Sequence, residues 1–292
     1  MKIETLVNLI GGELLNSPYI SEVTSFTDDE GKVLRGGCFF VYENSDVKTA
    51  VKNGAYAVIS EKYENIIDNE IAWIKVDSLE KAVIDIFKYE HLKEKVFICD
   101  EITENIIEKM NLNPNVVILK NCKDLLNALN LQNKILITSN RAYEELFANV
   151  EVLLPLDINL EKLTLFKSKF EGNEINLPYV YEDNFSRALK FFRDNGLKYT
   201  LEFNLDRFRP VFVDYKFRPV EYGESEKVVI TGIKNDRFFV KELNYFIENT
   251  KHAKSIVVDE YNVDLLKGSF NFALTVDLDV EFNEKEEYKG LV

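Results

Sequence analysis

The densest group of residues that could bind an anion lies in the segment RFRPVFVDYKFRPV, residues 207–220. Four cations alternate there with aromatic side chains; the cations are Arg207, Arg209, Lys216 and Arg218. Arginine offers phosphate a fixed fork of donors, so the segment is a candidate diphosphate or base pocket, with an aromatic ring against the base. A strand over this segment would place Val211, Val213, Tyr215 and Phe217 on one face and the polar side chains in solvent, which explains the same pattern without a ligand. Pro210 and Pro219 would suit an edge strand.

A second candidate anion site is formed by Ser139 and Asn140, which follow a predicted strand over 134–138 and precede a predicted helix over 141–147. The end of a parallel strand and the start of a helix can together bind an anion. N-capping of the helix by either side chain explains these two residues equally well.

Other reactive residue types do not have the spacing of a catalytic or metal site. The acidic runs Asp28-Asp29-Glu30 and 277–287 could bind a divalent cation, although such runs are more often solvated surface. Cys38, Cys99 and Cys122 lie in or beside apolar runs, as buried reduced thiols do. His91 and His252 are isolated. The sequence therefore predicts no catalytic residue, no metal and no cofactor.

The elements that would position a site are clearest near the N-terminus. The segment KVLRGGCFFV, residues 32–41, predicts a turn followed by a buried strand. A short helix over 46–53 is closed by Gly54, and residues 56–60 form the next strand. Strand, helix and strand at this spacing indicate a parallel crossover unit.

These residues resemble the N-terminal domain of the Mur ligases, the ATP-dependent enzymes that add amino acids to the UDP-linked muramic acid precursor of peptidoglycan. The matching positions are Val33, Gly36, Cys38, Phe39, Phe40, Gly54, Ala55, Ala57, Val58 and Ile59. The resemblance covers about the first 90 residues and implies an α/β domain, a bacterial source, and UDP-linked muramic acid precursors or cell-wall enzymes as partners.

The ligand-handling residues of that family are mostly replaced. Asp29 stands where the family has its aspartate, but Glu30 and Gly31 replace the serine and arginine that follow it. The loop over 42–47 is too short for the family's Asp-Gly-His segment. Glycine cannot replace the phosphate-binding fork of an arginine.

The ATP-binding loop of the family is also missing from the expected place. After the predicted strand 96–99 the sequence reads Asp100-Glu101-Ile102-Thr103-Glu104, with acids where a Gly-Lys-Thr loop would cradle phosphates. The later segment VVITGIKNDRFF, residues 228–239, has Asp236-Arg237 where Gly-Lys would be required. We therefore expect no binding of ATP.

Beyond Lys93, short apolar strands alternate with helices, which predicts a Rossmann-like, mostly parallel α/β region of no recognised family. The predicted domains are 1–93 and 94–292, with a further boundary near 157. The less regular second half predicts strands over 163–170 and 272–280 and a helix over 182–195.

Composition restricts the setting. A formal charge of −14 argues against nucleic acid or an anionic membrane as the partner. No apolar run reaches the ~18 residues that span a bilayer, and the N-terminus lacks a signal-peptide pattern, so we expect a cytoplasmic protein.

Three functions fit these observations. The first is a non-catalytic relative of the Mur ligases that binds a UDP-sugar, a peptidoglycan precursor or a cell-wall enzyme, without ligase activity. The second is a nucleotide-sugar or phosphate-ester enzyme whose site lies in the C-terminal region. The third is a structural or assembly protein. Asp29, Arg209 and Arg218 around one cleft would favour the first two.

Overall fold

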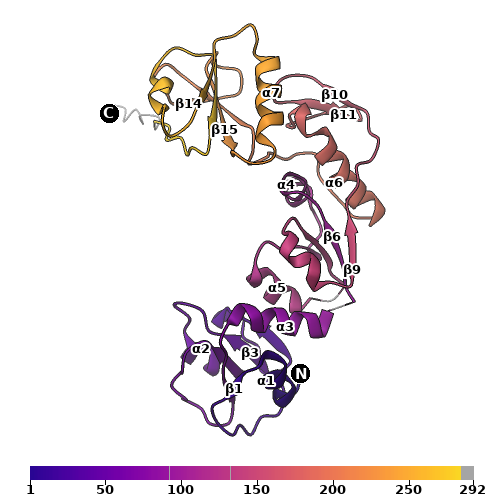
Figure 1. Ribbon diagram of the computed structural model, residues 1–292, viewed down its shortest axis with the longest axis vertical. Helices are drawn as coiled ribbons and strands as arrows, with labels where there is room; N and C mark the ends of the chain where they lie inside the picture. Colours follow the sequence, from indigo (N-terminus) through magenta and orange to yellow (C-terminus); the bar gives the residue numbers. More distant parts are fainter. Residues whose placement is uncertain (92, 132, 284–292) are drawn as a thin grey trace, which may run out of the picture. The chain divides into compact units, whose positions relative to one another are not determined.

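Strands and helices alternate along most of the chain in the computed structural model, which describes residues 1–91, 93–131 and 133–283 (Figure 1). The α-helices are α1 (Ile3–Ile10), α2 (Val47–Lys52), α3 (Leu79–His91), α4 (Glu101–Met110), α5 (Cys122–Leu129), α6 (Glu182–Asp194) and α7 (Phe239–Asn249). The strands are β1 (Glu13–Leu14), β2 (Ser25–Thr27), β3 (Gly37–Phe40), β4 (Ala55–Ser60), β5 (Ala72–Lys75), β6 (Lys95–Ile98), β7 (Val116–Ile118), β8 (Ile135–Thr138), β9 (Asn149–Val152), β10 (Leu160–Lys162), β11 (Ser168–Phe170), β12 (Asn173–Ile175), β13 (Arg209–Val213), β14 (Pro219–Val220), β15 (Val228–Ile233), β16 (Ser255–Val258) and β17 (Phe272–Val276).

The elements group into two compact units. The first unit contains Met1–Asp100 and Asn113–Leu153, and the second contains Glu101–Leu112 and the chain from Leu154 onward. Helix α4 therefore belongs to the second unit although it directly follows β6 in sequence.

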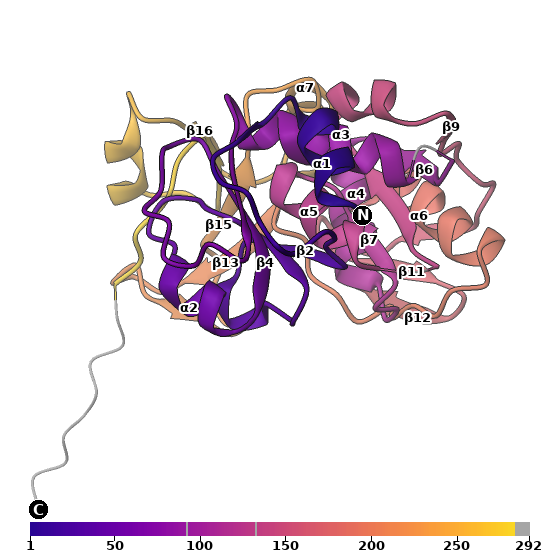
Figure 2. The ribbon, with the colours of Figure 1, turned by 90° about the horizontal axis from the view of Figure 1, so that it is seen from below.

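The first sheet of the first unit has the order β1-β5-β4-β3-β2, and all its strands except β1 run parallel. Alternating side chains bury both faces, with Phe40 and Ile59 in one core cluster and Phe39 and Val58 in the clusters on the other face. Helices α1 and α3 cover the first face and α2 the second, as Figure 2 shows. The predicted parallel crossover through α2 is confirmed.

The second sheet of the same unit is fully parallel, in the order β7-β8-β6-β9. Its core is continuous with that of the first sheet, because α3 packs on α5 and the rings of Phe87 and Phe147 meet edge to face at 5.7 Å. The boundaries between the two compact units lie at residues 100/101, 112/113 and 153/154, and none of them coincides with the predicted boundary at residue 93. That residues 1–93 form a domain of their own stays a prediction.

The second unit contains an antiparallel sheet, β10-β11-β12, and a mixed sheet in the order β14-β13-β15-β17-β16. In the mixed sheet β15, β17 and β16 are parallel, while β13 and β14 run antiparallel to their neighbours. The α/β class is therefore confirmed, with antiparallel additions that the strand pattern did not predict.

Three predictions of extended strands were right only in part, each because a local turn interrupts the chain. Of the predicted strand 163–170 only Ser168–Phe170 is extended, as β11; residues 163–167 form the turn after β10, where the Thr164 hydroxyl accepts hydrogen bonds from the amides of Phe166 and Lys167. The strand at 272–280 ends at Val276, before Asp277 adopts a φ of +47°. The alternation expected from Val211 to Phe217 stops at β13, because residues 214–218 form a hairpin turn.

Candidate functional sites

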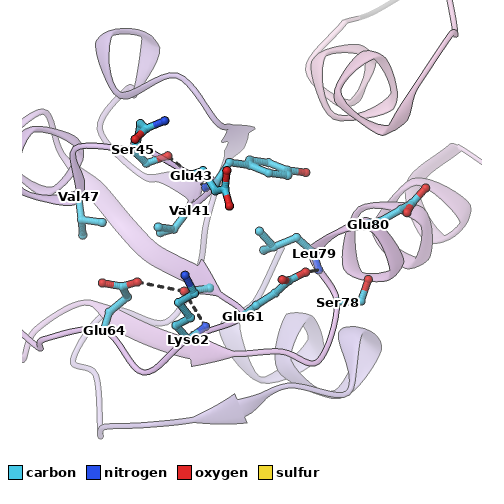
Figure 3. A pocket seen from close by; sticks show the side chains of 13 residues that line it. Val41, Glu43, Ser45, Val47, Glu61, Lys62, Glu64, Ser78, Leu79 and Glu80 are labelled. Carbon is cyan, nitrogen blue, oxygen red and sulfur yellow. Dashed lines mark hydrogen bonds between the residues drawn. The ribbon is translucent and has the colours of Figure 1, made fainter.

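A cavity of about 610 Å³ opens at the carboxyl ends of the parallel strands of the first sheet. It is lined by residues 41–45 and 47 after β3, residues 60–62 and 64 at the end of β4, and residues 78–80 at the start of α3 (Figure 3). We call it the N-terminal pocket. Loops at the carboxyl ends of parallel strands are where α/β folds bind ligands, because strand and helix termini converge there.

The charged side chains of the N-terminal pocket are Glu43, Glu61, Glu64, Glu80 and Lys62. Two of the carboxylates support the local fold. Glu61 accepts a hydrogen bond of 2.8 Å from the amide of Leu79, and Glu64 accepts one of 3.1 Å from the buried hydroxyl of Ser60. Glu43 and Glu80 form no side-chain hydrogen bond or ion pair with another residue of the described chain.

Two amides at the N-terminus of α3 already donate to side chains of the protein. Its Leu79 amide is taken by Glu61, and its Lys81 amide donates to the Ser78 hydroxyl at 3.2 Å. Four glutamates against one lysine also make the pocket electronegative. Its charges therefore favour a ligand group with a positive charge and oppose a diphosphate.

Asp29 and Asn140 accept hydrogen bonds from nearby backbone amides. Asp29 accepts a hydrogen bond of 2.9 Å from the amide of Gly31 and pairs with Lys32 at 3.0 Å. The interaction with Lys32 and the hydrogen bond from Gly31 lower the pKa of Asp29, against an opposing effect of burial. Asn140 caps a short 3-10 helix, Arg141–Leu146, by accepting from the amide of Ala142 at 3.0 Å, and Ser139 precedes it half-buried. The capping interpretation thus accounts for Asn140.

Arg207 is held inside a network of carboxylates in the second unit. Its Nη1 and Nη2 donate to both oxygens of Asp236, at 2.6 and 2.8 Å, and its Nε and Nη2 donate to the two oxygens of Glu242. Tyr181 also donates to Glu242, which is fully buried. Burial raises the pKa of Asp236, but the hydrogen bonds from Arg207 outweigh it and keep that pKa low. The guanidinium is consequently committed to the protein itself.

The other cations of the basic segment are distributed around the hairpin. Arg218 donates through Nε and Nη2 to Asp214, at 2.8 and 2.6 Å. Lys216 lies exposed at the turn beside the ring of Tyr215. Arg209 and Lys216 line two different pockets, and Arg218 lines neither of the two. Asp29 belongs to the other unit.

A cavity of about 490 Å³ in the second unit does bring Arg207 and Arg209 together. We call it the amide pocket, because two asparagine side chains are among its lining residues: Phe166, Lys167, Asn176, Pro178, Asn204, Leu205, Arg207, Phe208, Arg209, Pro210 and Tyr222. No carboxylate lines it.

Metal and thiol chemistry receive little support from the described part of the chain. No group of three or more His, Cys, Asp or Glu side chains there could hold a metal ion. Cys38 and Cys99 are buried, and burial raises the pKa of the half-buried Cys122 to about 11, which keeps its thiol protonated.

None of the described helices has both the length and the apolar character needed to cross a bilayer.

The glutamates of the N-terminal pocket and the asparagines of the amide pocket were not among the predicted site residues. For Glu43, Glu61 and Glu64 a signal existed, because each follows a strand of the predicted crossover unit and the carboxyl ends of such strands share one edge. No comparable signal marks Asn176 and Asn204, which meet only through the turns after β12 and before β13.

Comparisons with known proteins give a fold and no sequence family. No protein-family model matches the chain, and a search of curated proteins finds no match. One crystal structure of MurF from Acinetobacter baumannii matches with a TM-score of 0.51 and 10% identity, over 94% of this chain and 89% of the MurF chain. A UDP-N-acetylmuramoylalanyl-D-glutamyl-2,6-diaminopimelate--D-alanyl-D-alanyl ligase from the same organism matches with a TM-score of 0.51 and 9% identity, over 94% of each chain. The chain therefore has a Mur-ligase-like α/β fold.

Proposed function

We propose that this protein binds a peptidoglycan precursor in its N-terminal pocket and does not ligate it. The pocket itself carries the proposal: a cavity of about 610 Å³ at the carboxyl edge of a parallel sheet, in a Mur-ligase-like fold, with Glu43 and Glu80 uncommitted in the described structure. A cavity of this size accommodates a sugar or a short peptide.

The charge of the pocket specifies which part of a precursor enters it. The ligase from Acinetobacter baumannii is named for a UDP-N-acetylmuramoyl peptide that contains 2,6-diaminopimelate. That amino acid carries a second amino group, which is an ammonium ion at neutral pH and stands next to a carboxylate, opposite in charge to Lys62 of the pocket. Glu43 and Glu80 would pair with the ammonium, while the diphosphate of the precursor would remain outside the pocket.

The junction between β6 and α4 supports the proposal that the protein does not ligate the precursor. Only Cys99 and Asp100 separate Ile98 from Glu101, and neither glycine nor lysine is present there to cradle phosphates. The first turn of α4 adds Glu101 and Glu104 and no lysine or arginine that could hold a phosphate. The N-terminal pocket thus supports a ligand-binding role, whereas the β6–α4 junction gives no support to a reaction that uses ATP.

A thermal-shift titration of the full chain tests this function, since a ligand that binds the native state raises the unfolding midpoint. The ligands are UDP, UDP-N-acetylmuramic acid, its peptide derivatives with and without diaminopimelate, and Mg-ATP. We expect the diaminopimelate derivative to give the largest rise and Mg-ATP none. A rise with Mg-ATP would overturn the non-ligase proposal. If none of the precursors moves the midpoint, the structural or assembly role is favoured instead.

A further inference from the structure

The amide pocket has a chemistry of its own, unrelated to the N-terminal pocket. We propose that it binds the C-terminal end of a short peptide, with Arg209 on the terminal carboxylate, Asn176 and Asn204 on the last amide, and an apolar floor under the last side chain. This goes beyond the proposed function, because the site lies entirely in the second unit.

Arg209 supplies the available positive charge. It is exposed at the start of β13 and, within the described residues, forms no side-chain hydrogen bond and no ion pair. Arg207 is held by Asp236 and Glu242, and Lys167 pairs with Glu174 while lying 4.6 Å from the ring centre of Tyr222. A guanidinium with open donors is suited to a bidentate bond with a carboxylate.

The charges around the amide pocket favour a ligand with one negative charge over a ligand with two. The cations in and around the amide pocket are Lys109, Lys167, Arg207 and Arg209, and the carboxylates beside them are Glu174, Asp206, Asp236 and Glu242. These charges balance before a ligand arrives. A carboxylate therefore adds a single charge next to Arg209, whereas a phosphate dianion would meet more repulsion from the surrounding carboxylates.

The two asparagines present a donor and an acceptor side by side. Asn176 donates from Nδ2 to Oδ1 of Asn204 at 3.0 Å, which leaves Oδ1 of Asn176 and hydrogens on Nδ2 of Asn204 for another partner. A peptide group has one N–H and one C=O, so it matches this pair. Neither asparagine has another side-chain partner in the described structure.

The floor of the amide pocket is apolar. Phe166, Leu205 and Phe208 are buried, and Phe166 lies 6.3 Å from Phe208 between ring centres. Pro178 and Pro210 complete the apolar lining. A leucine-sized side chain would remove apolar surface from water there, at roughly 25 cal/mol per Å².

Calorimetric titration of the full chain with N-acetyl-Ala-Leu tests the proposal. We expect binding of this peptide, at least about tenfold weaker binding of its C-terminal amide, and a similar loss in the Arg209→Gln variant. Lys216→Gln is the matched control, since it removes an exposed cation of the same unit outside the amide pocket and should leave binding unchanged.

Two results would overturn the proposal. One is the absence of any heat with N-acetyl-Ala-Leu for the correctly folded wild-type chain. The other is tighter, Arg209-dependent binding of uridine monophosphate or inorganic phosphate, which would assign the amide pocket to a phosphate ligand. Neither result bears on the N-terminal pocket, whose precursor titration is read separately with its own glutamate variants.

Discussion

Arg207 and Glu242 form a two-bond ion pair in which Nε and Nη2 of the guanidinium donate to the two carboxylate oxygens. Glu242 belongs to α7 and is fully buried, whereas Arg207 precedes β13. Arg207, one of the four cations that the sequence offered as ligand contacts, is therefore a structural cation that neutralises a buried carboxylate.

Arg207→Ala should lower the free energy of unfolding by about 3 to 5 kcal/mol, because it leaves the buried carboxylate of Glu242 without its cation. Arg209→Ala is the matched control and should change it by less than about 0.5 kcal/mol, since that side chain is exposed. Urea denaturation of both variants measures the difference. Equal stability of the two would show that the network contributes nothing.

Gly232→Ala should be markedly more destabilising than Gly223→Ala. Both glycines have a positive φ, of +81° and +83°, so an alanine at either position would be held in a backbone conformation that it rarely adopts. A Cβ on Gly232 would come within 2.0 Å of the carbonyl oxygen of Asp206, whereas nothing lies within 4 Å at Gly223. We expect an additional loss of about 1 to 3 kcal/mol at Gly232, from overpacking. Thermal unfolding of the pair would contradict this if the midpoints coincide.

Stability should fall on acidification through protonation of His91. Burial lowers the pKa of this histidine, and so does the charge of Lys134, whose Nζ lies 3.1 Å from Nδ1 of His91. Glu94 and Glu90 oppose the shift. Because the folded pKa is below the unfolded value near 6.5, the unfolded state binds the extra proton first. The contribution is thus complete above pH ~6.5 and is lost as the pH falls from there towards the folded pKa.

The His91→Gln variant should show a flatter dependence of unfolding free energy on pH between 7 and 5, measured by urea denaturation. His252→Gln, which removes the exposed second histidine of the chain, should retain the wild-type slope. A wild-type slope in His91→Gln would assign the acid sensitivity to other groups.

Mg-ATP should be neither bound nor hydrolysed. The β6–α4 junction offers Asp100, Glu101 and Glu104 in place of a glycine-rich turn with lysine. A phosphate-release assay with UDP-N-acetylmuramoyl peptides and free amino acids present should give no signal above the protein-free rate. Release that depends on both precursor and amino acid would show ligase activity and contradict the proposal.

Sequence patterns located the regular elements well, because burial fixed them. The strand β4 and the helix α6, for example, were anticipated within one residue of their observed bounds, since their apolar side chains follow the strand and helix periods. The turns at Thr164 and Asp214 were missed, because in each a side-chain oxygen accepts hydrogen bonds from two backbone amides, which leaves the apolar pattern unchanged.

The candidate sites were harder to anticipate than the elements. Charge type alone made Arg207 and Arg218 look like ligand contacts, although each is neutralised by a nearby carboxylate, Asp236 or Asp214. The partner of Arg207 at Glu242 is 35 residues away and only the tertiary fold brings the two together. Glu43 and Glu80 likewise became candidate site residues only in the tertiary fold, because the loop after β3 and the start of α3 line the same pocket.

The measurement that decides most directly whether the N-terminal pocket binds a precursor is a calorimetric titration with the diaminopimelate-containing UDP-N-acetylmuramoyl peptide. The proteins are the wild type, the double variant Glu43→Gln/Glu80→Gln and the matched control Glu70→Gln/Glu90→Gln, whose glutamates are exposed in the same unit. We predict binding by the wild type and the control, and a loss of about tenfold or more, or ~1.4 kcal/mol, in the pocket variant. Equal binding by all three proteins, or no binding by the wild type, would contradict a precursor site at Glu43 and Glu80.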